Sequence, residues 1–182
     1  MSTFVTGFEP FAFPDSELLI LGSFPSVKSR AQGFYYGNPQ NRFWKTVCSF
    51  FGELPPADID GKKDFLQRRK IALWDVVTAC EITGSSDASI RNEKVADVAA
   101  LVAKSRIRAV YCNGKTAYSL LMREPPANVP ILCLPSTSPA NPRFLAAVWE
   151  ASLTKYCLTI QHLTTYHDYI RRTSPKTFSS CG

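Results

Sequence analysis

The sequence predicts an α/β fold, a single three-layer domain whose central parallel sheet of about four strands is flanked by helices. Two observations support this class. Short apolar runs recur along the chain, and segments with helical spacing lie between them. The runs are apolar throughout rather than alternating, so both faces of each strand should be buried, as in a parallel sheet covered by helices.

The expected elements follow in chain order. Strands are predicted at the apolar runs 18–21, 71–77, 107–112 and 129–134. Apolar residues at helical spacing predict helices after Asn38-Pro39 to residue 50, over 95–102, over 116–121, and from Pro142 to residue 156. The basic run Lys62–Lys70 predicts a solvated helix face, with a phosphate-contacting patch as the alternative.

The two ends of the chain differ from its middle. Residues 1–16 are expected to be irregular, and so is the tail 173–182, in which Ser, Thr, Pro and Gly dominate. No linker divides the remainder, so we expect one domain over 1–182 with its core at about 17–172.

Composition limits the class of protein. Of the 182 residues, 45% are hydrophobic, which is enough for an ordinary core. The 21 Lys and Arg against 15 Asp and Glu leave a net charge of +6, which suits a polyanionic partner without requiring one. No apolar run approaches a membrane span and no secretory signal is visible, so we expect neither membrane association nor export.

The cysteines and histidines do not form a ligand pattern. The six cysteines never occur as C-x-x-C pairs, and four lie in apolar runs, where free cysteine packs as a small hydrophobe. His162 and His167 are five residues apart and lack partners at metal-ligand spacing. We therefore expect no metal, no cofactor, and free thiols in a reducing compartment, either a cytoplasm with a nucleoid or a nucleus.

The motifs that could carry chemistry fall late in predicted strands or directly after them. They are Gly22–Ser26, Asp75, Asn113-Gly114 and Ser136–Ser138. Since the carboxyl ends of parallel strands meet at one edge of the sheet, a ligand is expected there. The adjacent aromatics Phe34–Tyr36 add ring faces, which together with nearby amides suit a planar polar ring such as a nucleobase.

Three strings carry a family resemblance. Gly22–Ser26, Tyr35–Trp44 and Leu134–Asn141 resemble the uracil-DNA glycosylase superfamily, and within it the branch of hypoxanthine-DNA (deoxyinosine) glycosylases. The similarity runs from about Glu17 to the helix after Pro142. It implies a DNA glycosylase, and because no lysine lies at the matching position of the Asn41 segment to form a Schiff base, we expect a monofunctional hydrolase. We also expect a monomer without a cofactor. Its partner would be DNA containing deaminated bases, from which it would excise flipped-out hypoxanthine in base excision repair of deaminated adenine.

The resemblance places the catalytic asparagine at Asn41. An amide takes up no proton near pH 7, so Asn41 would orient the attacking water rather than act as a base. Better-known superfamily members carry Asp or Asn where this chain has Phe24, which supports giving this role to Asn41. Alternatively, Asn41 only satisfies a free N–H in the first turn of a helix, and such capping is the stronger interpretation for Asn38 before Pro39.

Four residues are predicted to bind the base: Ser23, Phe24, Tyr36 and Asp75. The resemblance aligns Asp75 with the position that reads the base edge. A carboxylate only accepts hydrogen bonds, so it would pair with N1–H of hypoxanthine and repel the bare N1 of adenine. Backbone N–H groups around Ser23 and Phe24 can bind a base oxygen. Alternatively, Phe24 fills the core and Asp75 caps a loop.

A further set is predicted to hold the DNA. The string Ser136–Asn141 matches the superfamily loop that enters the minor groove, where hydroxyls suit phosphate oxygens. Relatives with strong uracil activity have a histidine at the Ser136 position, which argues against efficient uracil removal. Asn141 before Pro142 also has a capping interpretation, and Lys115 is equally an exposed lysine without a role. The predicted DNA contacts are Ser26, Lys115, Ser136, Thr137, Ser138 and Asn141.

Two alternatives stay open. One is a DNA glycosylase for uracil or another deaminated base, since uracil also offers a ring N–H to Asp75. The other is a non-catalytic nucleic-acid-binding module on the same fold, which would bind damaged DNA yet leave no alkali-labile site.

Overall fold

The computed structural model describes residues 3–173, with side chains for 4–159. At its centre is a four-stranded parallel sheet in the order β3-β2-β6-β7. The prediction of about four parallel strands at the four apolar runs is confirmed. Every residue of β2, β3 and β6 is buried, but the expected burial of both faces is wrong for β7, an edge strand in which only Leu134 is buried. The strands are β2 (Leu18–Gly22), β3 (Ile71–Asp75), β6 (Ala109–Asn113) and β7 (Ile131–Leu134).

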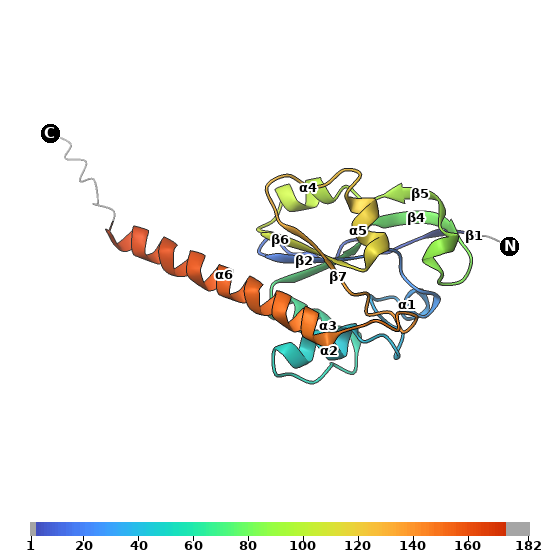
Figure 1. Ribbon diagram of the computed structural model, residues 1–182, viewed down its shortest axis with the longest axis horizontal. Helices are drawn as coiled ribbons and strands as arrows, with labels where there is room; N and C mark the ends of the chain where they lie inside the picture. Colours follow the sequence, from blue (N-terminus) through green and yellow to red (C-terminus); the bar gives the residue numbers. More distant parts are fainter. Residues whose placement is uncertain (1–2, 174–182) are drawn as a thin grey trace.

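Helices cover both faces of this sheet and complete the three predicted layers (Figure 1). Leu18 and Ile20 of β2 belong to a core shared with α2, α3 and the first turns of α6. Leu19 and Leu21 belong to a second core shared with α4 and α5. Successive residues of a strand point to opposite faces, so one apolar run supplies both cores. The helices are α1 (Val27–Gln32), α2 (Phe43–Phe50), α3 (Ile59–Arg68), α4 (Val98–Ala103), α5 (Lys115–Leu121) and α6 (Ala146–Thr173).

Two predicted helix starts are wrong. Asn38-Pro39 and Asn141-Pro142 form turns, and the helices α2 and α6 begin only at Phe43 and Ala146. In the first turn Asn38 Oδ1 accepts from Gln40 N at 3.1 Å, and in the second Asn141 Oδ1 accepts from Arg143 N at 3.0 Å. An asparagine side chain that bonds two residues ahead stabilises a turn as readily as a helix cap, so the local pattern does not distinguish them.

A second sheet, which the sequence pattern does not predict, is antiparallel with the order β1-β4-β5. The apolar run 71–77 does not continue as one strand: after β3 the Val76 and Val77 N–H groups donate to the Gly22 and Ser23 carbonyls, and the chain turns into β4. β5 is an exposed polar edge strand and lacks an apolar signal. The strands are β1 (Thr3–Thr6), β4 (Val77–Ile82) and β5 (Arg91–Val95), with a 3₁₀ turn, η1 (Asp87–Ser89), between the last two.

This sheet also corrects the expectation for the amino-terminal segment. The sequence predicts that residues 1–16 are irregular, but Thr3–Thr6 form β1 and pair with β4 in register from Thr3 opposite Ile82 to Thr6 opposite Ala79. The free backbone edge of β4 supplies the hydrogen bonds, which no local sequence feature reveals. The predicted irregular tail lies almost entirely outside the described residues.

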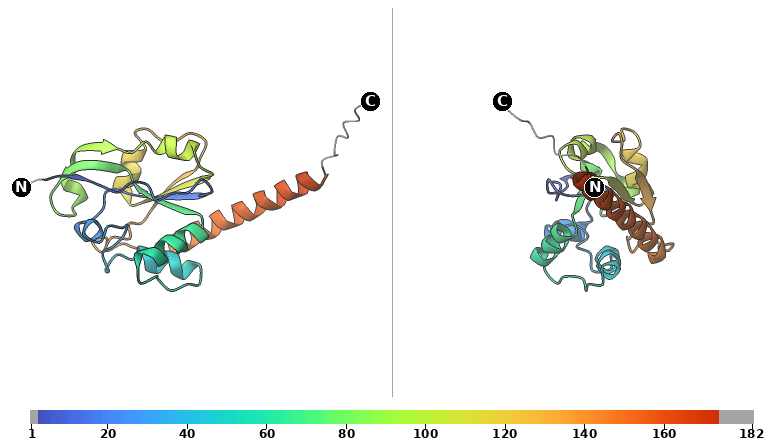
Figure 2. Two further views of the ribbon diagram at one scale, coloured as in Figure 1. Left: turned by 180° about the vertical axis from the view of Figure 1, so that it is seen from behind. Right: turned by 90° about the vertical axis from the view of Figure 1, so that its left-hand side faces the viewer.

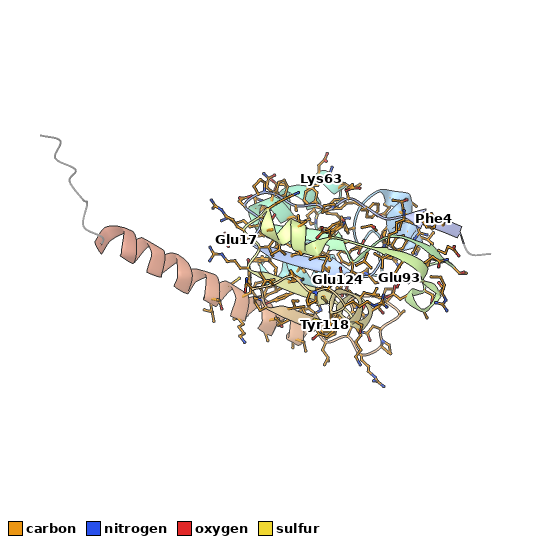
Figure 3. The ribbon with its side chains drawn as sticks, turned by 90° about the horizontal axis from the view of Figure 1, so that it is seen from above. Phe4, Glu17, Lys63, Glu93, Tyr118 and Glu124 are labelled. Carbon is orange, nitrogen blue, oxygen red and sulfur yellow. The ribbon has the colours of Figure 1, made fainter. Side chains whose placement is uncertain are left out.

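The two ends of the molecule differ. Helix α6 extends past the body of the molecule (Figures 1 and 2). Glu17, directly before β2, lies at the end from which α6 extends, and Phe4 of β1 lies at the opposite end (Figure 3). The carboxyl ends of the central strands therefore point away from the projecting helix. Among the described residues, no helix combines the length and apolarity needed to cross a membrane.

Candidate functional site

A cleft of about 890 Å³ lies at the carboxyl ends of the central strands. Its walls come from segments far apart in the sequence, including 22–29, 85–88 and 136–142, with Asp75 and Asn41 between them. Every predicted site residue except Lys115 lines this cleft. The gathering of the motifs at one edge of the sheet follows from parallel pairing, which aligns the strand ends.

Gly22, the last residue of β2, lets two polar side chains converge. A Cβ atom at this position would lie 2.2 Å from Asp75 Oδ1 and 3.5 Å from the Tyr36 hydroxyl. Gly22 and Asp75 are also paired in register across the β2–β3 ladder. The carboxylate therefore packs directly against the backbone of β2, a close approach that only glycine permits.

Asp75 is enclosed by protein, with 4% of the residue exposed. Its Oδ2 atom is buried and has no hydrogen-bond partner among the described residues. Burial, and then the negative charge of Asp87, raise the pKa of Asp75 to about 7. A buried polar atom without a partner is unfavourable, so its place in the cleft indicates a ligand that donates a hydrogen bond.

Tyr36 is held rigidly in the wall of the cleft. Its φ of 53° lies in the left-handed region, which is uncommon for a bulky residue and occurs preferentially at functional sites. Its ring stacks on Phe43 with centroids 3.8 Å apart and planes at 18°. Burial, and then the negative charge of Asp75, raise the pKa of Tyr36. The buried hydroxyl has no hydrogen-bond partner among the described residues. The hydroxyl is thus kept protonated beside Asp75.

The turn after β2 offers two free backbone donors. Its carbonyls at Gly22 and Ser23 accept from Val76 and Val77, but the N–H groups of Ser23 and Phe24 have no acceptor in the described part of the chain. The Phe24 side chain is 9% exposed and belongs to the core beside β2, although its edge reaches the cleft. The Phe24 side chain therefore packs in the core, as the alternative interpretation expected, and because it also lines the cleft its contact with a base stays a prediction.

Asp87 adds a second carboxylate that the sequence analysis missed. Its Oδ1 accepts a hydrogen bond from Ser23 Oγ at 2.8 Å, across a separation of 64 residues. Partial burial raises the pKa of Asp87, and interactions with the Ser23 and Thr116 hydroxyls lower it. Asp87 lies in a polar hairpin segment without a recognisable motif, so no signal in a single sequence points to it.

Asn41 is oriented by the helix that follows it. Its Oδ1 accepts from Phe43 N at 2.9 Å, and its backbone N–H donates to Asn38 O at 2.8 Å. The Nδ2 group has no partner among the described residues, and the residue lines the cleft. The capping interpretation is therefore confirmed, yet it leaves Nδ2 and one Oδ1 lone pair for a water molecule. The catalytic role stays a prediction.

The loop Ser136–Asn141 is tied to the end of β6. Asn113 Nδ2 donates to Thr137 Oγ1, and Asn113 Oδ1 accepts from Thr137 N, both at 2.8 Å. Thr137 is fully buried and its hydroxyl already accepts from Asn113, so it is less accessible to DNA than its neighbours in the loop. Its contact with DNA stays a prediction. Asn141 Nδ2 closes the loop by donating to Ser136 O at 2.8 Å.

The remaining predicted DNA contacts differ in how accessible their side chains are from the cleft. Ser136 and Ser138 line the cleft and are partly exposed, which leaves their hydroxyls accessible. Ser26 also lines the cleft but caps α1 by accepting from Ser29 N at 3.2 Å. Lys115 begins α5 as an exposed residue outside the cleft lining.

In the described residues, no group of three His, Cys, Asp or Glu side chains is placed to hold a metal ion.

A family model described as the uracil DNA glycosylase superfamily matches residues 10–153, a range that contains the central sheet and every residue that lines the cleft. The chain belongs to the uracil DNA glycosylase superfamily. The resemblance seen in the three sequence strings is thereby confirmed, and the superfamily sheet positions the cleft described above.

Two relatives match most of the chain. The protein named hypoxanthine DNA glycosylase of Methanosarcina acetivorans is 37% identical over 152 residues, which cover 80% of this chain and 95% of the relative. That of Methanosarcina barkeri is 35% identical over 143 residues, covering 76% and 89%. A solution NMR structure of a candidate uracil DNA glycosylase from Methanosarcina acetivorans superposes with a TM-score of 0.71 at 35% identity, covering 82% of this chain and 96% of that one.

Proposed function

We propose that this protein is a monofunctional DNA glycosylase that hydrolyses the N-glycosidic bond of hypoxanthine in DNA containing deoxyinosine. The observation that carries the proposal is the buried Asp75 Oδ2 atom, which lacks a partner among the described residues and lies in the cleft beside two free backbone amides. The names of the two relatives support the same base.

Hypoxanthine offers the groups that complement this site. Its N1–H would donate to ionised Asp75, and its O6 would accept from the Ser23 and Phe24 amides. The hydrogen bond from N1–H favours the ionised carboxylate against the burial that disfavours it. Adenine presents an acceptor at N1 and donors at N6, so like groups would meet at both contacts. A site whose buried polar groups are left unpaired rejects such a ligand strongly.

The bond is broken by water. A water molecule held by Asn41 adds to C1′ while the C1′–N9 bond breaks, and the electron pair of that bond leaves with the base. The Ser23 and Phe24 amides stabilise the negative charge that develops on O6. The water loses its proton to solvent and the base gains one, which yields free hypoxanthine and an abasic site. Asn41 needs only to orient the water, because the sugar carries most of the positive charge in the transition state.

The rim of the cleft suits the DNA strand. A base must leave the stack to reach Asp75, and the flanking phosphates then pass over the loop Ser136–Asn141. The accessible hydroxyls of Ser136 and Ser138 suit phosphate oxygens. The net charge of +6 favours the approach of a polyanion.

The test uses four duplexes that differ in one base: inosine, uracil, xanthine or ethenoadenine. Alkali after incubation cleaves the strand at an abasic site, so the fraction cut measures excision. We expect the inosine duplex to be cut fastest. Tight binding without an alkali-labile site on any duplex would identify a non-catalytic module instead.

Uracil is the second candidate, because its ring N–H would also donate to Asp75 Oδ2. Faster cutting of the uracil duplex would replace hypoxanthine by uracil as the substrate. The variant Asp75→Asn keeps the shape of the side chain but adds an amide donor, so it should reduce the selection of inosine over adenine. Unchanged selectivity in this variant would show that Asp75 does not read the base.

A further inference from the structure

Arg42, the residue after Asn41, is hydrogen-bonded to the loop Ser136–Asn141. Its Nε atom donates to Thr137 O at 3.4 Å, and its Nη2 atom donates to Ser138 O and, at 2.9 Å, to Asn141 O. Its backbone N–H adds a further bond to Thr137 O at 3.1 Å. Loop and helix entry are more than 90 residues apart in the sequence, yet one residue joins them.

The positive charge of Arg42 is not matched by a carboxylate. None of the ion pairs among residues 4–159 includes it. The guanidinium instead bonds neutral carbonyls and lies 4.4 Å from the centre of the Phe144 ring. A guanidinium stays charged, and half-burial leaves it less screened by salt than a surface lysine. By contrast, Arg68 and Arg69 both pair with Glu53.

The contacts of Arg42 join two segments whose relative position should affect the reaction rate. Asn41 is fixed through the first turn of α2, whereas Ser136 and Ser138 are on a separate loop. Under the proposed function the DNA would touch both, since its backbone would rest on the loop while its C1′ atom would face the water held by Asn41. A misplacement of about 1 Å between such groups can cost about 10²-fold in rate.

We propose that Arg42 is a positioning residue of the reaction. It fixes the loop Ser136–Asn141 relative to Asn41, and its unpaired charge draws the phosphate backbone onto that loop. The positioning part rests on the proposed function, because it needs a reaction centre at Asn41. The electrostatic part concerns any DNA and can be tested without a damaged base.

Two substitutions of Arg42 separate the effect of its planar set of hydrogen-bond donors from the effect of its positive charge. Arg42→Lys keeps the charge but removes the planar donors that reach several carbonyls at once, and Arg42→Met removes both. Lys45→Met is the matched control, because Lys45 is an exposed cation on the same helix, α2, outside the cleft lining. Each variant is measured by single-turnover excision of hypoxanthine, by binding to an undamaged duplex, and by hydrogen exchange of the peptide 136–142.

Arg42→Lys should bind undamaged DNA within about twofold of the parent, yet lose about 10- to 100-fold in single-turnover rate. Amides in 136–142 should exchange about tenfold faster, because loop opening becomes easier. Arg42→Met should show the same exchange and also bind undamaged DNA about tenfold more weakly. Lys45→Met should keep the parent rate and exchange.

The outcomes are distinct. Parent rate and parent exchange in Arg42→Lys would overturn the positioning role, and parent affinity in Arg42→Met would overturn the role of the charge. If Arg42→Met fails to fold, Arg42→Lys still decides the first point, and the neutral variant Arg42→Gln decides the second, because parent affinity for undamaged DNA in that variant would overturn the role of the charge. If the parent excises no base, the proposed function fails, whereas hydrogen exchange and binding to undamaged DNA still report on Arg42.

Discussion

The buried carboxyl of Asp75 should make the protein less stable as the pH rises, and Asp75→Asn should remove this dependence. The pKa of this group is raised from 3.8 to about 7. Between these values the folded protein keeps a proton that the unfolded chain has released. Stability therefore falls with rising pH across this window, which is the opposite of the usual behaviour of a paired aspartate.

The magnitude follows from the linkage relation. The full interval corresponds to about 4 kcal/mol, of which about 2.6 kcal/mol falls between pH 5 and pH 8. The amide that Asp75→Asn introduces does not titrate, so the free energy of unfolding of the variant, relative to the parent, should rise by about 2 to 3 kcal/mol from pH 5 to pH 8. The buried amide has its own unpaired donors, so only the slope is predicted and not the absolute stability.

The assay is urea unfolding of the parent and variant at pH 5, 6, 7 and 8, with the free energy extrapolated to water. Asp60→Asn is the control, because the Asp60 side chain is 97% exposed and should give a curve parallel to that of the parent. If the Asp75→Asn curve is also parallel to the parent curve, the carboxyl is not desolvated and its proposed place in the base pocket fails.

Four further predictions concern activity. Asn41→Ala should bind inosine DNA as the parent does but excise about 10² to 10³ times more slowly in single turnover; a parent rate would remove Asn41 from the reaction. Gly22→Ala should abolish most excision while the fold survives, because the new Cβ would lie 2.2 Å from Asp75 Oδ1; full activity would show that the carboxylate can move aside freely. Below the Asp75 pKa of about 7 the protonated acid can donate to N1 of adenine, so the preference for inosine over adenine should fall as the pH drops from 8 to 6. Asp87→Asn removes a like charge, so it should move the midpoint of this pH dependence to lower pH. A preference that does not change with pH would contradict the role of ionised Asp75 in base recognition. Affinity for DNA should fall steeply between about 50 and 200 mM salt as counterions are released, and a flat curve would argue against phosphate contacts.

Much of the site could be predicted because it depends on local sequence patterns and on the parallel arrangement of the strands. Leu18–Leu21 is apolar at every position, and a strand with this pattern is stable mainly in the interior of a sheet that is covered on both faces. Once the runs are parallel, Gly22 and Asp75 must end at the same edge. The string around Asn41 likewise identifies the family from its residues alone.

Other features depend on contacts between distant segments, for which a single sequence carries no signal. Asp87 reaches Ser23 only because the segment between β4 and β5 folds back beside the central sheet, and Thr137 is held by Asn113 only because β6 ends beside the loop that follows β7. The protonation of Asp75 is of the same kind, since desolvation is a property of the enclosing walls and not of the residue. The sequence by itself therefore determined the four strands of the central sheet, the edge where they end and the family. Only the tertiary structure decided which polar groups at that edge are free to meet a ligand, because these hydrogen bonds and this burial arise between segments that are far apart in the sequence.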